Sequence, residues 1–133
     1  MNLLLDTHVI LWIAFNEEKL SKKVKSLILS SDSQIFLSAV SFWEISIKYQ
    51  MGKLNLGTHT PSSLLEGFKK YFDHYFLDLN AKESATFYQL QTSHHRDPFD
   101  RMLIWQAINN GLDLISNDEL VKQYEDTGLK IIW

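Results

Sequence analysis

Four acidic residues spread along the chain are the side chains best suited to chemistry. Asp6 follows an apolar stretch near the N-terminus, Glu44 lies further along, and Asp100 and Asp118 lie in the last third. Magnesium prefers oxygen ligands and keeps several waters, so two to four carboxylates around an open position make a suitable site. Such a site can hydrolyse a phosphodiester, because the metal lowers the pKa of an attacking water and stabilises charge on the phosphate.

The acids fall where strands are expected to end. Asp6 closes an apolar strand predicted at residues 3–6, and Asp118 follows the strand predicted at residues 112–116. Glu44 lies one turn into a helix that follows another strand. The carboxyl ends of parallel strands share one edge of a sheet, where ligand sites are usually built. We therefore expect several of these carboxylates to converge.

Strands and helices alternate along the sequence. Apolar runs predict strands at residues 3–6, 35–38, 76–79, 112–116 and 130–133. Helical spacing, capping residues and glycine stops predict helices at residues 7–15, 21–29, 41–51, 60–71, 81–91 and 97–110. This order favours an α/β fold with a mostly parallel sheet covered on both faces. No repeat or long linker divides the chain, so residues 1–133 are expected to form one domain.

The acids also have explanations that need no metal. Ser41 and Glu44 have the spacing of a capping box, in which the serine caps a helix and the glutamate reaches back to its N–H. Asp118 can cap a helix that starts at the next residue. Capping does not account for Asp6, because burying an unpaired carboxylate among apolar neighbours is costly. A metal or a hydrogen-bond network must compensate there.

Composition excludes several classes of protein. The 133 residues are 45% hydrophobic, which is enough for one sizeable core, and the lack of cysteine rules out disulfides and thiolate zinc sites. The formal net charge of −3 has the wrong sign for non-specific coating of nucleic acid, although bound Mg²⁺ would reverse the charge where phosphate must bind. No apolar stretch has the length of a membrane span, the first residues do not resemble a signal peptide, and we expect a cytoplasmic protein.

Four segments resemble, in order and spacing, those of the PIN-domain ribonucleases, specifically the VapC toxin type. They are LLDTH at residues 4–8, SAVSFWEI at 38–45, HRDPFDRMLI at 95–104 and LISNDE at 114–119. The third is highly specific, and the resemblance runs over nearly the whole chain. It implies a three-layer α/β/α PIN fold, with Asp6, Glu44, Asp100 and Asp118 as the catalytic, metal-binding acids.

The same resemblance implies an activity and its partners. The cofactor is expected to be Mg²⁺, for which Mn²⁺ can substitute, and the reaction is endonucleolytic cleavage of RNA by metal-activated water. The protein is expected to be the toxin of a toxin–antitoxin pair, held in check by a cognate antitoxin protein. A homodimer of the nuclease is also expected.

Asp97 and Asp100 compete for the third acid position. Asp97 can cap a helix with Pro98 at its first position, and Asp100 can be its reciprocal capping partner. The family's motif places its acid seven residues before a small residue, and Asp100 precedes Ala107 by that spacing. We assign Asp100 to the metal and Asp97 to capping or to orienting the ligands. Ser116 matches a family threonine or serine whose hydroxyl is expected to hold an acid or a metal-bound water.

Basic residues near the acids are candidates for contact with RNA. Arg96 and Arg101 flank the acidic motif, and Lys48 lies one turn after the second acid. An arginine beside carboxylates is equally often an ion-pair partner, and a lysine on a helix is usually solvated surface. The pair His94 and His95 is predicted to lie in a surface loop, because a magnesium site prefers oxygen to imidazole.

Aromatic residues near the acids favour structural roles. Trp12, Trp43 and Trp105 fall on otherwise apolar helical faces and are predicted to be core residues rather than base-stacking platforms. His8, two residues after the first acid, either points into the site or packs beside it.

Two other functions fit parts of the sequence. A haloacid-dehalogenase-like phosphatase would use Asp6 as a covalent nucleophile after an apolar strand. That family needs a second aspartate two residues further on, where this chain has His8. A non-catalytic acidic binding module would use its acids to cap helices and to attract a basic partner segment. Such a module would bind its partner without metal and would cleave nothing.

Overall fold

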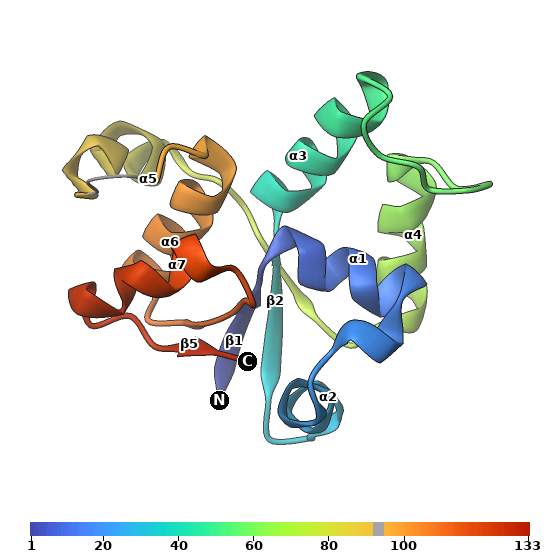
Figure 1. The fold of residues 1–133 in the computed structure, drawn as a ribbon, viewed down its shortest axis with the longest axis horizontal. Helices are drawn as coiled ribbons and strands as arrows, with labels where there is room; N and C mark the ends of the chain where they lie inside the picture. The colour runs from blue at the N-terminus through green and yellow to red at the C-terminus, as the bar shows by residue number, and fades with distance from the viewer. Residues whose placement is uncertain (92–94) are drawn as a thin grey trace.

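A computed structural model describes residues 1–91 and 95–133 of the chain. In this described part, five parallel strands form one sheet in the order β3-β2-β1-β4-β5 (Figure 1). The strands are β1 (Asn2–Leu5), β2 (Gln34–Ser38), β3 (Tyr75–Leu77), β4 (Asp113–Ile115) and β5 (Ile131–Ile132). The prediction of a mostly parallel sheet is confirmed.

Helices connect the strands and cover both faces of the sheet. The helices are α1 (Thr7–Phe15), α2 (Lys22–Leu29), α3 (Ala39–Gln50), α4 (Pro61–Tyr71), α5 (Ala81–Thr86), α6 (Pro98–Asn110) and α7 (Glu119–Lys122). Short 3₁₀ turns lie at η1 (Glu17–Lys19), η2 (Phe87–Gln89) and η3 (Gln123–Thr127). Figure 1 shows α1, α2 and α4 on one side of the sheet and α5, α6 and α7 on the other.

Two apolar clusters, one on each face of the sheet, form the core. Side chains alternate along the central strand, so Leu3 and Leu5 join the cluster beneath α1, α2 and α4, whereas Leu4 joins the cluster beneath α6 and α7. A strand buried on both faces must be apolar at every position, which explains its run of leucines. The arrangement is the expected three-layer α/β/α fold.

The start of α3 differs from the sequence-based expectation. Ser38, the last residue of β2, caps the helix by accepting a hydrogen bond from Val40 N, so the helix begins at Ala39 with no intervening loop. Ser41 is instead buried inside the helix, and its Oγ accepts a hydrogen bond from Thr7 Oγ1 at 3.0 Å. The capping-box explanation of Glu44 is therefore wrong.

Two other boundaries also shift. The strand expected at residues 76–79 is found at Tyr75–Leu77, and the helix expected at residues 81–91 ends at Thr86. The chain then turns inward through η2 and buries Leu90 against α6 and its neighbours. A local pattern cannot predict that turn, because its cause is the position of the core.

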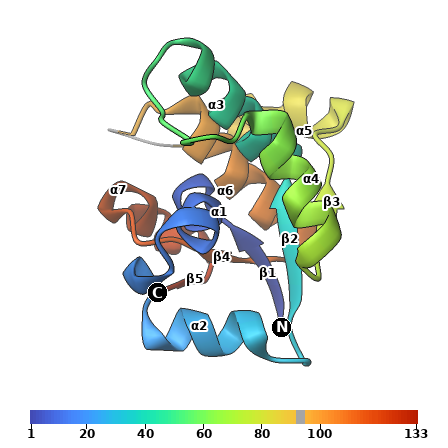
Figure 2. The same ribbon diagram turned by 90° about the vertical axis from the view of Figure 1, so that its right-hand side faces the viewer.

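The two ends of the sheet have different surroundings. Figure 2 shows α2 across the end at which β1 begins, away from the carboxyl ends of the strands. At the opposite end, α1 follows β1 directly and α3 follows β2 directly. In the described residues, no helix has the length and apolar character needed to cross a membrane.

Candidate active site

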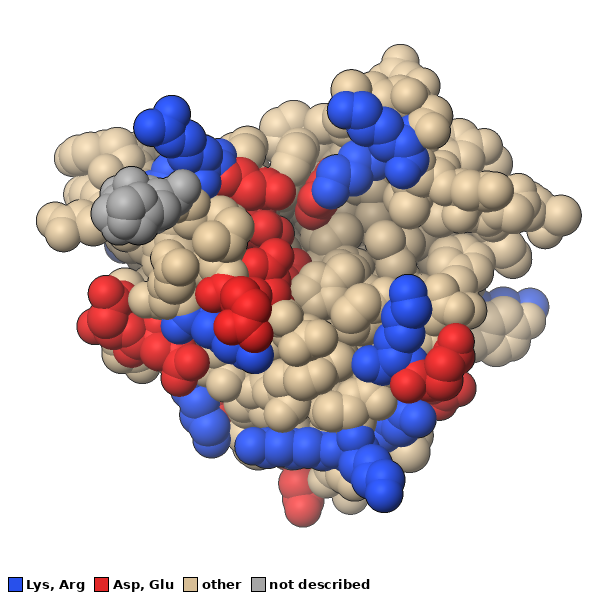
Figure 3. Space-filling view, viewed as in Figure 1, with Lys and Arg blue, Asp and Glu red and all other residues tan. Residues whose placement is uncertain are grey.

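The predicted acids converge at the carboxyl edge of the sheet. They line one cavity of about 200 Å³, and Figure 3 shows red acidic side chains gathered in the hollow between the two halves of the molecule. The acids in its lining are Asp6, Glu44, Asp97, Asp100 and Asp118, and Lys48 is a cation beside them. The topology thus places side chains from β1, α3, α6 and the end of β4 around one space.

Asp6 is the most deeply embedded of these acids. Its side chain is 2% exposed; Oδ1 accepts a hydrogen bond from Thr7 N at 2.7 Å and Oδ2 accepts one from Ser116 Oγ at 2.6 Å. His8 Nδ1 lies 3.3 Å from Oδ2. Burial raises the pKa of Asp6 above its ordinary value, even though His8, Ser116 and Thr7 lower it. The predicted hydrogen-bond network is present, yet it does not fully offset burial of the charge.

Glu44 has one paired and one unpaired oxygen. Oε2 lies 2.5 Å from Lys48 Nζ, one turn along α3. Oε1 is buried and has no hydrogen-bond partner among residues 1–91 and 95–133. Burial lowers the pKa of Lys48, but the hydrogen bond and charge of Glu44, with the charges of Asp97 and Asp100, raise it overall. A buried carboxylate oxygen needs a partner, and a cation bound in the cavity that Glu44 lines would supply it.

The pKa of Asp100 shows how strongly the acids repel one another. Its side chain lies at the first turn of α6, with Oδ2 3.3 Å from His95 Nε2. Burial raises its pKa most, and the charges of Asp6, Asp97, Glu44 and Asp118 raise it further, to about 8. Without a bound cation, Asp100 therefore holds a proton at neutral pH.

Asp97 and Asp118 have the capping roles that the sequence suggested. Asp97 accepts hydrogen bonds from Phe99 N at 2.9 Å and from Asp100 N at 3.3 Å, and Asp118 caps α7 through Leu120 N at 2.8 Å. Each carboxylate still lines the cavity while it caps a helix. One aspartate can therefore cap a helix and still be placed to bind a metal.

Ser116 connects two of the acids. It is fully buried, donates its hydroxyl to Asp6 Oδ2 and accepts a hydrogen bond from Asp118 N at 3.1 Å. The same hydroxyl therefore orients the first acid and shapes the turn that carries the fourth. This position agrees with the expected role of Ser116 in holding an acid.

We expect Ser116→Ala to lower the free energy of unfolding by about 1 to 3 kcal/mol, because it leaves buried polar groups without a partner. Urea denaturation followed by circular dichroism measures this change. Ser26→Ala, on the exposed face of α2, is the matched control and should unfold as the wild type does. Equal loss in both variants would show that the hydroxyl of Ser116 adds nothing beyond an ordinary surface serine.

The donor set fits an oxygen-preferring divalent cation. Among the residues that the structure describes, no group of three or more His, Cys, Asp or Glu side chains is placed to hold an ion directly. Mg²⁺ usually binds through one or two carboxylates and reaches others through its waters, so the acids around this cavity suit it. The unpaired Glu44 Oε1 and the raised pKa values of Asp6 and Asp100 indicate that Lys48 does not neutralise all of the acidic charge in the cavity.

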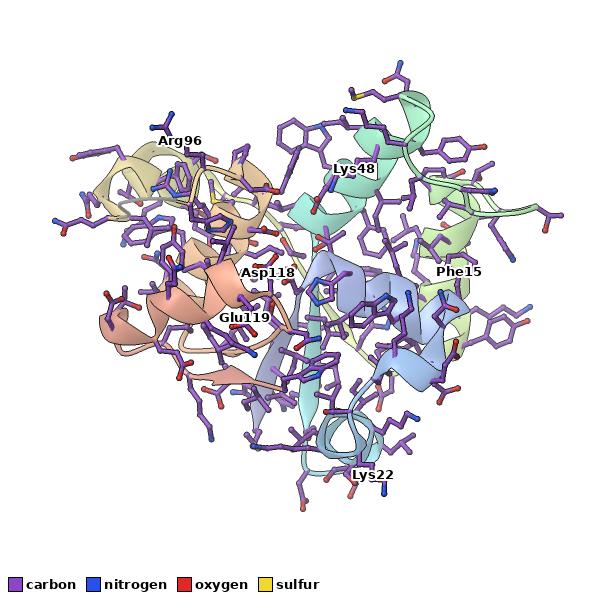
Figure 4. The ribbon with its side chains drawn as sticks, in the orientation of Figure 1. Phe15, Lys22, Lys48, Arg96, Asp118 and Glu119 are labelled. Atoms are coloured by element: carbon purple, nitrogen blue, oxygen red, sulfur yellow. The ribbon has the colours of Figure 1, made fainter. Side chains whose placement is uncertain are left out.

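The basic residues predicted to contact RNA lie in different surroundings. Lys48 and Arg96 lie on opposite sides of the gap between the two halves of the molecule, and Asp118 lies lower in the view (Figure 4). Arg101 points elsewhere: its Nη2 donates a hydrogen bond to Leu90 O at 2.7 Å, and its guanidinium lies 4.8 Å from the ring of Phe87. The structure therefore gives Arg101 a packing role and offers no support for RNA contact through it.

Two histidines lie closer to the acids than the sequence predicted. His95 is 3% exposed and faces Asp100, so its predicted place in a surface loop is wrong; His94 lies outside the described residues. His8 lines the cavity, and its Nε2 accepts a hydrogen bond from Asn117 N at 3.3 Å, which leaves Nδ1 to face Asp6. The position of His8 two residues after Asp6 was a usable signal for this contact. No local signal predicted the burial of His95.

One of the tryptophan predictions is wrong. Trp12 and Trp105 are partly buried in apolar clusters, as expected. Trp43 is 58% exposed and packs its ring against Phe99, with the two ring centroids 5.4 Å apart. Trp43 therefore lies at the surface, where α3 meets the first turn of α6, and not in the core.

Comparisons with known proteins agree with this architecture. A family model described as PIN domain matches residues 3–126. Ribonuclease VapC22 of Mycobacterium tuberculosis is 23% identical over 131 residues, covering 98% of this chain and 97% of that protein.

Solved structures show the same fold. VapBC2 from Rickettsia felis, bound to a DNA fragment from its promoter, aligns with a TM-score of 0.71 at 19% identity, covering 99% of this chain and 98% of that chain. DNA-bound VapBC from Salmonella typhimurium aligns with a TM-score of 0.67 at 19% identity, covering 99% and 97%. Both likenesses extend over nearly the full length of each chain and show that the fold is the same.

Proposed function

This chain belongs to the PIN domain family, and on that premise we propose that it is a metal-dependent endoribonuclease. The observation that carries the proposal is the single cavity lined by five carboxylates, one of which has a buried oxygen without a partner in the described residues. Asp6, Glu44, Asp100 and Asp118 are the proposed ligands of Mg²⁺, with Mn²⁺ as a substitute. Asp97 and Ser116 orient them.

The chain's own residues prepare the cavity for hydrolysis. When bound, the cation lowers the pKa of a water and stabilises charge on the phosphate and the leaving oxygen. Ser116 and Thr7 hold the Asp6 carboxylate in one orientation, and Lys48 holds Glu44. Because its pKa is about 8, Asp100 can release a proton near neutral pH when positive charge enters the cavity.

Lys48 and Arg96 are the proposed contacts for the RNA backbone. They lie on either side of the acidic opening (Figure 4), so a strand that crosses the cavity would pass between two positive charges. Phosphate contacts of this kind position a nucleic acid without reading its sequence. The acids alone would repel the strand, and the cation removes that repulsion.

A non-catalytic binding module explains less of the site. Asp6, Asp97 and Asp118 each cap a helix, as that alternative requires. Glu44 caps nothing, however, and the raised pKa of Asp100 reflects charges brought together from separate segments. A structure that needed only caps has no reason to concentrate five carboxylates on one cavity. The phosphatase alternative lacks its second aspartate, since His8 at that position faces Asp6.

We also propose that the chain acts as the toxin of a toxin–antitoxin pair. Its relative is named Ribonuclease VapC22 and the solved neighbours are named VapBC, which supports a cognate antitoxin protein as its partner. A homodimer is also proposed, as the resemblance of the sequence to the VapC type implies. Cellular RNA as substrate would place its action in the cytoplasm.

The direct test uses the purified chain, freed of any co-purifying partner, and total bacterial RNA. We expect discrete fragments on a sequencing gel in the presence of Mg²⁺ and none in EDTA, because the carboxylates act through the cation. Mn²⁺ should restore cleavage after EDTA treatment. Fragments that persist in EDTA would contradict metal dependence, and intact RNA in every lane would favour the binding module.

A further inference from the structure

Trp43 is the one tryptophan of the four whose side chain is mostly exposed. It is 58% exposed, whereas Trp12, Trp105 and Trp133 are partly buried. Trp12 and Trp133 pack against each other, and Trp105 donates its indole N–H to Thr86 Oγ1. An exposed indole offers a large, rigid apolar face on which a flat partner can stack.

Trp43 contacts the helix that carries the third acid. Its ring meets that of Phe99 edge to face, so the pair joins α3 to the first turn of α6. Trp43 directly precedes Glu44, and Phe99 directly precedes Asp100. The aromatic pair thus stands beside the second and third acids, on the two helices that carry them. Phe99 supports the indole from one side and leaves most of its surface open.

The charges around the opening indicate what kind of molecule would cover this ring. Figure 3 shows blue basic side chains on both sides of the acidic hollow, and Figure 4 identifies Lys48 and Arg96 among the residues that flank it. A molecule that fits must therefore carry negative charge along its length and flat apolar surface at intervals. A nucleic acid strand with unpaired bases has both properties.

We propose that Trp43, supported by Phe99, is a stacking platform for one unpaired nucleobase of the RNA next to the cleaved phosphate. The platform rests on the proposed ribonuclease function and assigns one residue of this chain, Trp43, to the base beside the cleaved phosphate. In a duplex, both faces of each base are stacked on their neighbours, so an indole at the rim has no base face to bind. Lys48 and Arg96 would hold the backbone while Trp43 holds a base.

The test measures binding of a short fluorescein-labelled oligoadenylate by fluorescence anisotropy in Mg²⁺, with every protein in an Asp6→Asn background so that the strand stays intact. Loss of one base–aromatic stack should weaken binding by roughly fivefold or more in Trp43→Ala. Trp43→Phe keeps an aromatic face and should retain most of the affinity. Tyr88→Ala removes a side chain that is 81% exposed on η2 and serves as the matched control, with no change expected.

A second readout separates stacking from a general loss of binding. The emission of tryptophan should fall when oligoadenylate binds, and the fall should disappear in Trp43→Phe but persist in Trp12→Phe. Binding of the same strand paired with oligouridylate should be equal in the parent and in Trp43→Ala. Thermal melting should show that Trp43→Ala stays folded.

Three outcomes would overturn the platform. The first is equal affinity of Trp43→Ala and its parent for the single strand. The second is an equal loss of affinity for the single strand and for the duplex in Trp43→Ala. The third is a shift from dimer to monomer in sedimentation with RNA affinity unchanged, which would assign Trp43 to contact with a second copy of the chain. Because cleavage of total RNA is measured separately, each of these results would leave the ribonuclease proposal standing.

Discussion

Asp6→Asn is expected to abolish RNA cleavage while the protein remains folded. The substitution keeps the shape of the side chain and an oxygen that can accept the hydrogen bond from Thr7 N, but it removes the charge at the centre of the cavity. Metal-assisted stabilisation is worth several kcal/mol in such reactions, so the rate should fall by about a thousandfold or more. Gel analysis of RNA fragments over time measures the rate.

The fold should survive because burial already raises the pKa of Asp6 and so disfavours its charged form. A neutral amide relieves that penalty, and we expect the melting temperature to stay near the wild-type value. Asp126→Asn, an exposed acid on η3, is the matched control and should cleave RNA as the wild type does. Full activity in folded Asp6→Asn would remove the first acid from the proposed site.

Binding of Mg²⁺ is expected to depend steeply on pH, with Asp100 as the main cause. Since its pKa is about 8, the cation must displace a proton from Asp100 at lower pH. Affinity should therefore rise about tenfold for each pH unit up to about pH 8 and then level off. Calorimetric titrations in buffers of different ionisation enthalpy count the protons released.

The affinity for Mg²⁺ should rise with pH, whereas the free energy of unfolding of the metal-free protein should fall. The folded pKa of Asp100 lies above its ordinary value of 3.8, so its contribution to stability is fully present below 3.8 and is lost as pH rises through about 8. In EDTA, unfolding by urea should therefore become easier across this window. Added Mg²⁺ should offset the loss at the upper end.

Asp100→Asn tests whether Asp100 is the group that causes both pH dependences. It cannot titrate, so both the pH dependence of Mg²⁺ affinity and the decline in stability should become shallower. Asp126→Asn again serves as control, because it lies outside the cavity. An unchanged pH profile in Asp100→Asn would show that the proton comes from another group, and Asp6, whose pKa is also raised, would be the next to test.

Much of the fold could be predicted because it depends on local patterns. Three consecutive leucines before Asp6 indicate a strand buried on both faces, and the structure places β1 at the centre of the sheet. Asp97 and Pro98 predict the start of α6, and Gly111 its end, where the backbone has a φ of 64° that favours glycine. Each of these features involves residues a few positions apart, so the sequence alone contains the information.

The surroundings of single side chains could not be predicted in this way. Ser38 rather than Ser41 caps α3, because α3 begins directly where β2 ends. His95 is buried and Trp43 is exposed, which reverses both expectations. Arg101 turns toward Leu90, and nothing near it in the sequence indicates that partner.

The positions of the acids at the ends of strands can be read from local patterns, since apolar runs, caps and glycine stops act over a few residues. Only the packed fold shows that Asp97 joins the four predicted acids around their cavity, and that four neighbouring charges together with burial raise the pKa of Asp100 to about 8. It also decided that Ser116 reaches Asp6 across most of the chain length. The reason is physical: burial and electrostatic repulsion depend on distances between segments that only the packing of the sheet and its helices brings together.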